Sequence, residues 1–226
     1  MQIRANGKKA RPRARGVSTI EFAFATLVLV PLFLGTGATG INMVRTLQTE
    51  QLARDVGHMY ARGLDFSLPG NLTVVGKLGE NLGLSLTAGQ GNAVVILSSF
   101  TYVDTNACAS VGAVDGSGNP TAACTNYQKW VFTQRLTIGK SSLRASNYGT
   151  PTCPIDPTTG KITQTNYVKN AGAQARLSGV NPYQVVNNIA SGLPSGQMLY
   201  LAEAAAIGFT MPPFVSTQTT YAYGFF

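Results

Sequence analysis

The segment Arg15-Gly-Val-Ser-Thr-Ile-Glu-Phe22 and the apolar residues that follow it, up to Val44, decide the fold of this chain. Six basic residues and no acid precede Gly16, and only one charged residue, Glu21, lies between Gly16 and Val44. A basic patch followed by an apolar segment of this length is typical of a single-pass membrane anchor with a short cytoplasmic N-terminus. We expect everything after Arg45 on the other side of the membrane.

Glu21 is the unusual residue of this segment. A carboxylate at the bilayer centre costs roughly 2.5–3.5 kcal/mol on insertion scales and less near the boundary, so an acid within a membrane segment is a functional candidate. The simpler interpretation is an acid at the lipid boundary with its carboxylate in water. The alternative depends on the residues around it.

Gly16, four further residues, Glu21-Phe22 and an apolar helix together resemble the processing site of type IV prepilins, where a membrane peptidase cuts after the glycine. By that resemblance Val17 becomes the new N-terminus and Glu21 the fifth mature residue. The resemblance implies that the new ammonium group of one subunit neutralises the buried carboxylate of another as their helices pack in lipid. Such a pair is tolerated there only when both charges are matched.

Neighbouring residues narrow this resemblance. The segments Gly16-Val-Ser-Thr-Ile-Glu-Phe-Ala23, Pro31-Leu-Phe-Leu34 and Gln51-Leu-Ala-Arg-Asp-Val-Gly-His-Met-Tyr-Ala-Arg-Gly63 are similar to the TadE-like family of minor pilins, the pseudopilins of the tight-adherence (Flp, type IVb) pilus. The similarity covers about the first quarter of the chain, and residues 130–139 and 221–226 show a weaker similarity to the same family. Phe22 stands where major Flp pilins usually have tyrosine, which favours the minor class.

The resemblance implies a structural protein and not an enzyme, with no cofactor, metal or small-molecule substrate. Its implied partners are a prepilin peptidase, other pilins and the Tad assembly machinery of the bacterial inner membrane. It implies a role in pilus assembly, initiation or the tip, and leaves open whether the protein enters the pilus. One alternative is a membrane-tethered periplasmic binding protein or enzyme, which predicts a discrete pocket with convergent polar groups and an uncleaved N-terminus. The other is a type II secretion pseudopilin, which would share the cleavage.

The net charge of +8 comes mostly from the first sixteen residues. From residue 17 onward the chain has eleven basic residues and nine acidic ones, which nearly cancel. Membrane topology therefore explains the basic patch better than contacts with nucleic acid do. A removed signal peptide conflicts with Glu21 and with the length of the apolar run. Residues 35–40 match G-x-G-x-x-G, but no strand precedes them, so we expect small residues at a helix contact and not a nucleotide site.

We predict an α+β protein with a basic leader (residues 1–16), a transmembrane and stalk helix (17–63) and a β-rich antiparallel periplasmic domain (64–226). From Ile41 to Tyr60 the apolar residues are mostly three to five positions apart, which predicts an amphipathic helix that ends at Gly63. Residues 197–209 have helical composition, but bounding glycines favour a strand. A short helix at 182–190 is expected from Asn181 and Pro182. The predicted strands are residues 72–75, 93–103, 129–138, 161–168, 197–209 and 219–226.

The three cysteines, Cys108, Cys124 and Cys153, all follow the apolar segment. In an oxidising periplasm two should pair, and although connectivity does not follow from sequence, a Cys108–Cys124 disulfide would close a polar loop between two predicted strands. Cys153 is then free or pairs between chains. A single histidine, His58, argues against zinc and is expected to be an ordinary helix residue. The motif Asp115-x-Ser-x-Asn119 is expected to form a surface turn.

Overall fold

The computed structural model describes residues 15–177, 196–212 and 215–226, and side chains from residue 19 onward. A long helix is followed by one antiparallel sheet with the strand order β2-β1-β3-β4, in agreement with the predicted α+β class. The helices are α1 (Arg15–Ala61), α2 (Pro69–Leu78), α3 (Thr105–Ser110) and α4 (Gln164–Lys169), with 3₁₀ turns at Glu80–Leu82, Ser141–Leu143 and Ala171–Ala173. The strands are β1 (Ala93–Tyr102), β2 (Trp130–Gly139), β3 (Met198–Ile207) and β4 (Thr219–Phe225).

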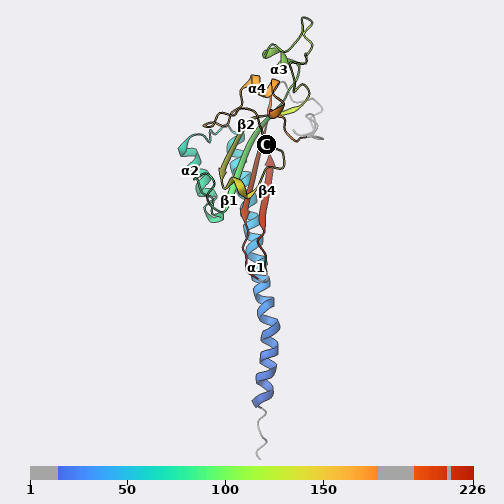
Figure 1. Ribbon diagram of the computed structural model, residues 1–226. Helices are drawn as coiled ribbons and strands as arrows, with labels where there is room; N and C mark the ends of the chain where they lie inside the picture. The colour runs from blue at the N-terminus through green and yellow to red at the C-terminus, as the bar shows by residue number, and fades with distance from the viewer. Residues whose placement is uncertain (1–14, 178–195, 213–214) are drawn as a thin grey trace, which may run out of the picture.

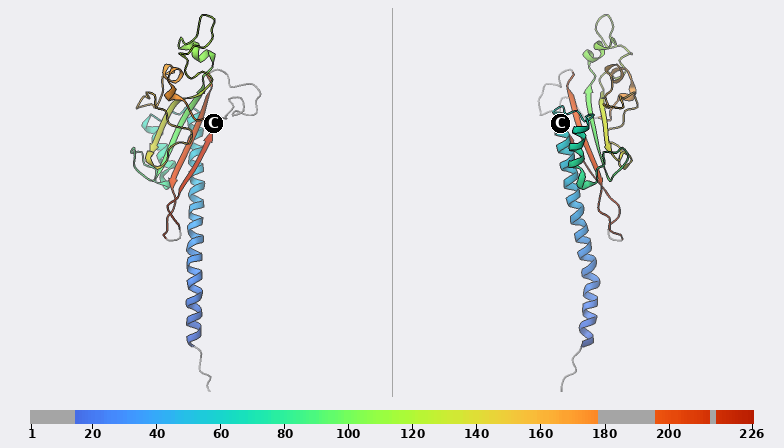
Figure 2. Two further views of the ribbon diagram at one scale, coloured as in Figure 1. Left: turned by 45° about the vertical axis from the view of Figure 1, so that its right-hand side comes forward. Right: turned by 90° about the vertical axis from the view of Figure 1, so that its left-hand side faces the viewer.

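Helix α1 has a half that projects from the domain and a half that packs on the sheet. Its first half extends away from the sheet as a rod, and its second half lies along one face of the sheet (Figure 1). Figure 2 shows this second half beside β3 and β4, with the loops that carry α3 and α4 beyond the far end of the sheet. The helix ends as predicted: Gly63, at φ 82°, follows it, and the Leu64 N–H bonds to the Met59 carbonyl to close the last turn.

The core under α1 is built from a helical stripe and alternate strand residues. The helix buries Leu52, Val56 and Tyr60, which lie at the three-to-four-residue spacing of one helix face. Strand β3 meets this stripe with small side chains, because its alternate residues on this face are alanines and strand side chains alternate between faces. The buried sheet residues in this core are Ala93, Val95, Leu97, Ile138, Ala202, Ala204 and Ala206.

The opposite face of the sheet holds a buried carboxylate, Glu203, which is 1% exposed. It accepts hydrogen bonds from the Ser146 hydroxyl, from the Tyr221 hydroxyl at 2.7 Å and from the Asn147 backbone N–H at 3.3 Å. Burial raises the pKa of Tyr221, so its hydroxyl stays a donor at neutral pH. Glu203 therefore ties the loop after β2 to the centre of the sheet.

Four of the predicted strands are confirmed, and two predictions are wrong. Residues 72–75 lie in α2, where Pro69 occupies the first turn and Val75 is buried. Residues 161–168 contain only a bridge at Lys161, and α4 then begins after Thr163, whose side chain caps the helix. The confirmed strands correspond to the predictions at residues 93–103, 129–138, 197–209 and 219–226. The helix predicted at 182–190 lies outside the described residues.

Replacing Gly57 by alanine should destabilise the domain, although alanine is the better helix former. The ring of Phe226 packs on the helix at Gly57 and edge-on against His58, with ring centroids 4.7 Å apart, and a Cβ at Gly57 would overlap it. The substitution gains about 1 kcal/mol of helix propensity, but displacing the ring forfeits up to about 1.5–3 kcal/mol of apolar burial. We expect a lower midpoint in thermal unfolding of the full chain in detergent.

The control is the same substitution in a Phe226→Ala background. The three atoms nearest to the new methyl group, all from the Phe226 ring, are then absent, so Gly57→Ala should stabilise that variant by about 1 kcal/mol. Equal effects in both backgrounds would contradict the assigned contact.

Candidate functional site

The first half of α1 carries the main exposed apolar surface of the described chain. By length and composition, the helix from Thr19 to Ala61 could cross a membrane, with a mean hydropathy of 1.8 in its most apolar window. An apolar surface of this extent marks a contact with lipid or with other protein. The large exposed side chains in its first part are Ile20, Phe22, Phe24, Leu27, Val28, Leu29, Val30, Leu32, Phe33 and Leu34.

The polar groups inside this apolar surface are satisfied by the helix itself. The hydroxyl of Thr26 donates to the Phe22 carbonyl at 2.9 Å, and that of Thr39 donates to the Gly35 carbonyl at 2.8 Å. Thr36 makes the same bond one turn back. These hydroxyls are therefore hydrogen-bonded without water. An apolar environment requires this, because it offers no water to bond to. The helix also continues through Pro31.

Glu21 is the exception to this rule. Its side chain is exposed, and among the described side chains it has neither a hydrogen bond nor an ion pair. Phe22 beside it is 70% exposed. Gly16 and Val17, the predicted cleavage residues, belong to the same helix, but their side chains are outside the described part. The described side chains therefore leave the Glu21 carboxylate unpaired at the surface of the helix.

The glycines of the apolar segment leave open space on the helix surface. A Cβ at Gly35, Gly37 or Gly40 would meet nothing within 4 Å. This is the arrangement that lets a second helix approach closely. The dinucleotide interpretation of these glycines fails structurally as well, because they lie within an unbroken helix.

A group of polar side chains joins α1 to the loop end of the β3-β4 hairpin. The Asn42 side chain donates to the Phe209 carbonyl at 3.1 Å and accepts from the Phe209 N–H at 2.7 Å. Arg45 donates to the Ile207 carbonyl at 2.7 Å. The hydroxyls of Thr49 and Thr220 lie 2.8 Å apart. The apolar rod is thus fastened to the sheet by hydrogen bonds where it leaves the domain.

Cys108 and Cys124 form a disulfide, as predicted, and Cys153 is a buried free cysteine. The loop between the paired cysteines contains the predicted surface turn, in which the Asp115 carboxylate accepts the backbone N–H groups of Ser117 and Asn119, both at 2.9 Å. These bonds, chiefly that from Asn119, lower the pKa of Asp115. Both features stabilise the loop near α3.

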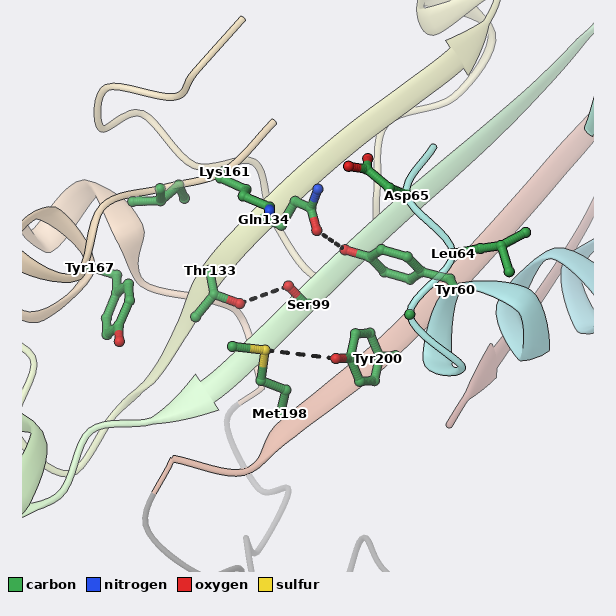
Figure 3. Close-up of a pocket in the computed structure, with 12 residues that line it drawn as sticks. Tyr60, Leu64, Asp65, Ser99, Thr133, Gln134, Lys161, Tyr167, Met198 and Tyr200 are labelled. Carbon is green, nitrogen blue, oxygen red and sulfur yellow. Dashed lines mark hydrogen bonds between the residues drawn. The ribbon is translucent and has the colours of Figure 1, made fainter. Parts of the chain in front are cut away.

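A cavity of about 460 Å³ opens beyond the end of α1 (Figure 3). Its floor is polar: the buried Ser99 and Thr133 hydroxyls lie 2.7 Å apart, and the Tyr60 hydroxyl donates to the Gln134 side-chain oxygen at 3.0 Å. Burial raises the pKa of Tyr60 well above its ordinary value, so this hydroxyl stays protonated. The remaining lining residues are Gly63, Leu64, Asp65, Lys161, Ile162, Tyr167, Met198 and Tyr200.

Sequence reasoning missed the joint at Asn42 and this cavity. Asn42 and its partner Phe209 are separated by 167 positions, and no local pattern marks either. Comparisons of the chain with protein-family models, with curated proteins and with solved structures find no match. The interpretation of both sites therefore depends on the residues and geometry of this chain.

The three cysteines should differ sharply in a thiol-labelling experiment. Burial raises the pKa of the Cys153 thiol, so it is protonated at neutral pH and should label only after unfolding. Cys108 and Cys124 should label only after reduction. Loss of their bridge, which spans a sequence separation of 16, should cost about 3 kcal/mol in the chain-entropy estimate. Peptide mapping checks the pairing, and a bridge from Cys124 to Cys153 would contradict it.

Proposed function

We propose that this protein is a minor pilin, or pseudopilin, of a tight-adherence (Flp, type IVb) pilus. A prepilin peptidase removes residues 1–16, and the mature protein stays in the bacterial inner membrane with its sheet domain in the periplasm. It acts through its helix in assembly, initiation or the tip of the pilus, with other pilins as partners. The observation that carries the proposal is Glu21, a carboxylate without a partner among the described side chains, in the exposed apolar half of a helix whose other half is packed on a sheet.

The two halves of α1 support this role in different ways. The exposed half offers apolar side chains and open glycine positions to other helices. The packed half is fixed to the sheet by the Asn42 and Arg45 bonds. A subunit whose helix enters an assembly must transmit force between helix and domain, and these contacts join the two.

The cavity at the end of α1 favours a second candidate, a membrane-tethered periplasmic binding protein. Such a protein keeps its N-terminus and uses α1 only as an anchor. A type II secretion pseudopilin is a third candidate that shares the cleavage. The fate of the N-terminus separates the second candidate from the other two.

Cleavage between Gly16 and Val17 is the first expected outcome. N-terminal sequencing of protein from peptidase-positive cells should begin at Val17. Gly16→Leu should retain the leader, because the peptidase must approach the backbone closely at that residue. The matched control is Gly7→Leu, which places the same bulk in the leader away from the cut and should leave cleavage unchanged. Met1, or the residue after it, at the N-terminus of the wild-type protein would overturn the proposal.

Glu21→Ala should abolish assembly while leaving the protein in the membrane. If Glu21 meets the Val17 ammonium of a neighbour, its removal strands a positive charge in lipid, and breaking one side of a buried pair costs about 3–5 kcal/mol in soluble proteins. Crosslinking in the membrane and a count of surface pili measure the effect. An acid at the lipid boundary would predict easier insertion and normal piliation.

The matched control for Glu21→Ala is Glu50→Ala on the same helix. Glu50 makes an exposed pair with Arg54 at 3.4 Å, and such pairs contribute about 0–1 kcal/mol. This variant should assemble normally. Wild-type piliation by a stably expressed Glu21→Ala protein would remove the pairing hypothesis.

A further inference from the structure

We infer that the cavity beyond the end of α1 binds a neutral pyranose sugar. The inference does not depend on the proposed role in a pilus, because every lining residue belongs to the domain or to the packed end of α1. The cavity, at about 460 Å³, is within the roughly 300–1,000 Å³ of small-molecule sites.

A β-bulge builds the floor of the cavity. Ser99 of β1 pairs with Gln134, whereas Phe100 pairs with Phe132, so Thr133 is an extra residue in β2. In a regular strand, residues 133 and 134 would point to opposite faces of the sheet. Both line the cavity instead, and bulges commonly re-aim side chains beside functional sites.

The floor is held in a defined arrangement and keeps free hydrogen-bonding capacity. The Gln134 amide nitrogen donates to the Thr159 carbonyl at 2.6 Å while its oxygen accepts from Tyr60. One amide N–H and one oxygen lone pair of Gln134 remain. This pattern of one donor beside one acceptor suits a hydroxyl group, which is both.

Three tyrosines from three elements surround this floor. Figure 3 shows Tyr167 on one side and Tyr60 and Tyr200 on the other, with Ser99 and Thr133 between them. Tyr60 and Tyr200 pack edge to face, with ring centroids 5.1 Å apart. An aromatic ring provides an apolar surface and a polar end, which matches a sugar ring with C–H groups on its face and hydroxyls at its edge.

Two tyrosine hydroxyls have bonding capacity for a ligand. Within the described residues, the Tyr167 hydroxyl has no hydrogen-bond partner, and burial raises its pKa, so it stays a donor. Among the described residues, the Tyr200 hydroxyl has one hydrogen-bond partner, the Met198 sulfur at 3.8 Å. A thioether is a weak acceptor, so a sugar oxygen would replace it favourably.

The charges at the rim favour a ligand without net charge. The Asp65 carboxylate accepts the Ser67 hydroxyl at 2.7 Å and the Ser67 N–H at 2.9 Å, and these bonds lower its pKa. Lys161, on the rim, is exposed and lowers the Asp65 pKa further. One cation and one anion at the rim offer little selectivity for an anion. A purely apolar ligand would leave the free donor and acceptor of Gln134 covered without a hydrogen-bond partner.

The test is saturation-transfer NMR on the full chain, in a detergent whose headgroup is not a sugar. Methyl β-D-glucopyranoside is the basic probe, and an N-acetylated cell-wall disaccharide and a neutral hexose oligomer distinguish two sources of the same chemistry. Hexose phosphate and an extended tetrapeptide are the contrasting ligands. We expect saturation of the C–H protons of neutral sugars, with weaker signals from the phosphate and the peptide.

Two variants place the binding in the cavity. Tyr167→Ala and Tyr200→Ala each remove one aromatic wall and leave the floor side chains of Ser99, Thr133 and Gln134 unchanged. Each should weaken sugar binding by about tenfold, the scale of one aromatic contact. The matched control is Tyr223→Ala, which removes a 53% exposed tyrosine from the opposite face and should leave binding unchanged.

Thermal midpoints confirm that each variant folds, and either cavity variant alone decides the test if the other fails to fold. The inference is overturned if folded wild-type protein binds none of the neutral sugars at millimolar concentration. Preference for the peptide or the phosphate would overturn it, as would equal binding by wild-type protein and the folded cavity variants.

Discussion

The packing of α1 on the alanines of β3 is the contact on which the rest of the structure depends. Ala202, Ala204 and Ala206 present small side chains to the helix, so its apolar stripe lies close to the sheet and buries Val56 completely. Larger residues at these alternate positions would push the helix outward and open voids that close-packed interiors do not tolerate. A small residue on the helix has the same effect as the alanines on the strand. Gly57 has no side chain, so the ring of Phe226 can pack directly on the helix there.

One consequence is that a single unbroken helix is packed on the sheet in one half and presents exposed apolar side chains in the other. About 20 residues suffice to cross the apolar core of a bilayer, so the span beginning at Thr19 could end near Ala38. Exposed apolar side chains nevertheless continue to Met43 and Leu47, which are 66% and 54% exposed, beyond that length. This extra surface lies beside the joint at Asn42. It suits contact with a neighbouring helix better than contact with water.

Local sequence patterns predicted the elements whose cause is local. The apolar runs of β1 and β2, the helical stripe ending at Tyr60 and the glycine stop at Gly63 follow from spacing alone. The sequence of β3 is less distinctive, because its alanines favour a helix; pairing with β1 and β4 on its two sides holds it as a strand. The two wrong strands show cap chemistry overriding β-branched composition, through Pro69 in α2 and Thr163 before α4.

The candidate sites also differ in whether their cause is local in the sequence. Glu21 stands out in the sequence because its cost depends only on its immediate apolar neighbours. The cavity does not, since Tyr60, Ser99 and Tyr167 meet only after the sheet forms, and a single bulge re-aims Thr133. No spacing rule encodes that meeting.

The two unusual glutamates of the chain, Glu203 and Glu21, lie in opposite environments. Glu203 is buried, and its own domain supplies three hydrogen-bond donors. These bonds replace the ones that the carboxylate would make to water. Glu21 receives no donor from any described side chain. The same carboxylate chemistry is therefore satisfied inside the domain and left open on the helix. The domain thus supplies hydrogen-bond donors to the glutamate that it buries, whereas the described side chains supply none to the glutamate in the exposed apolar half of α1.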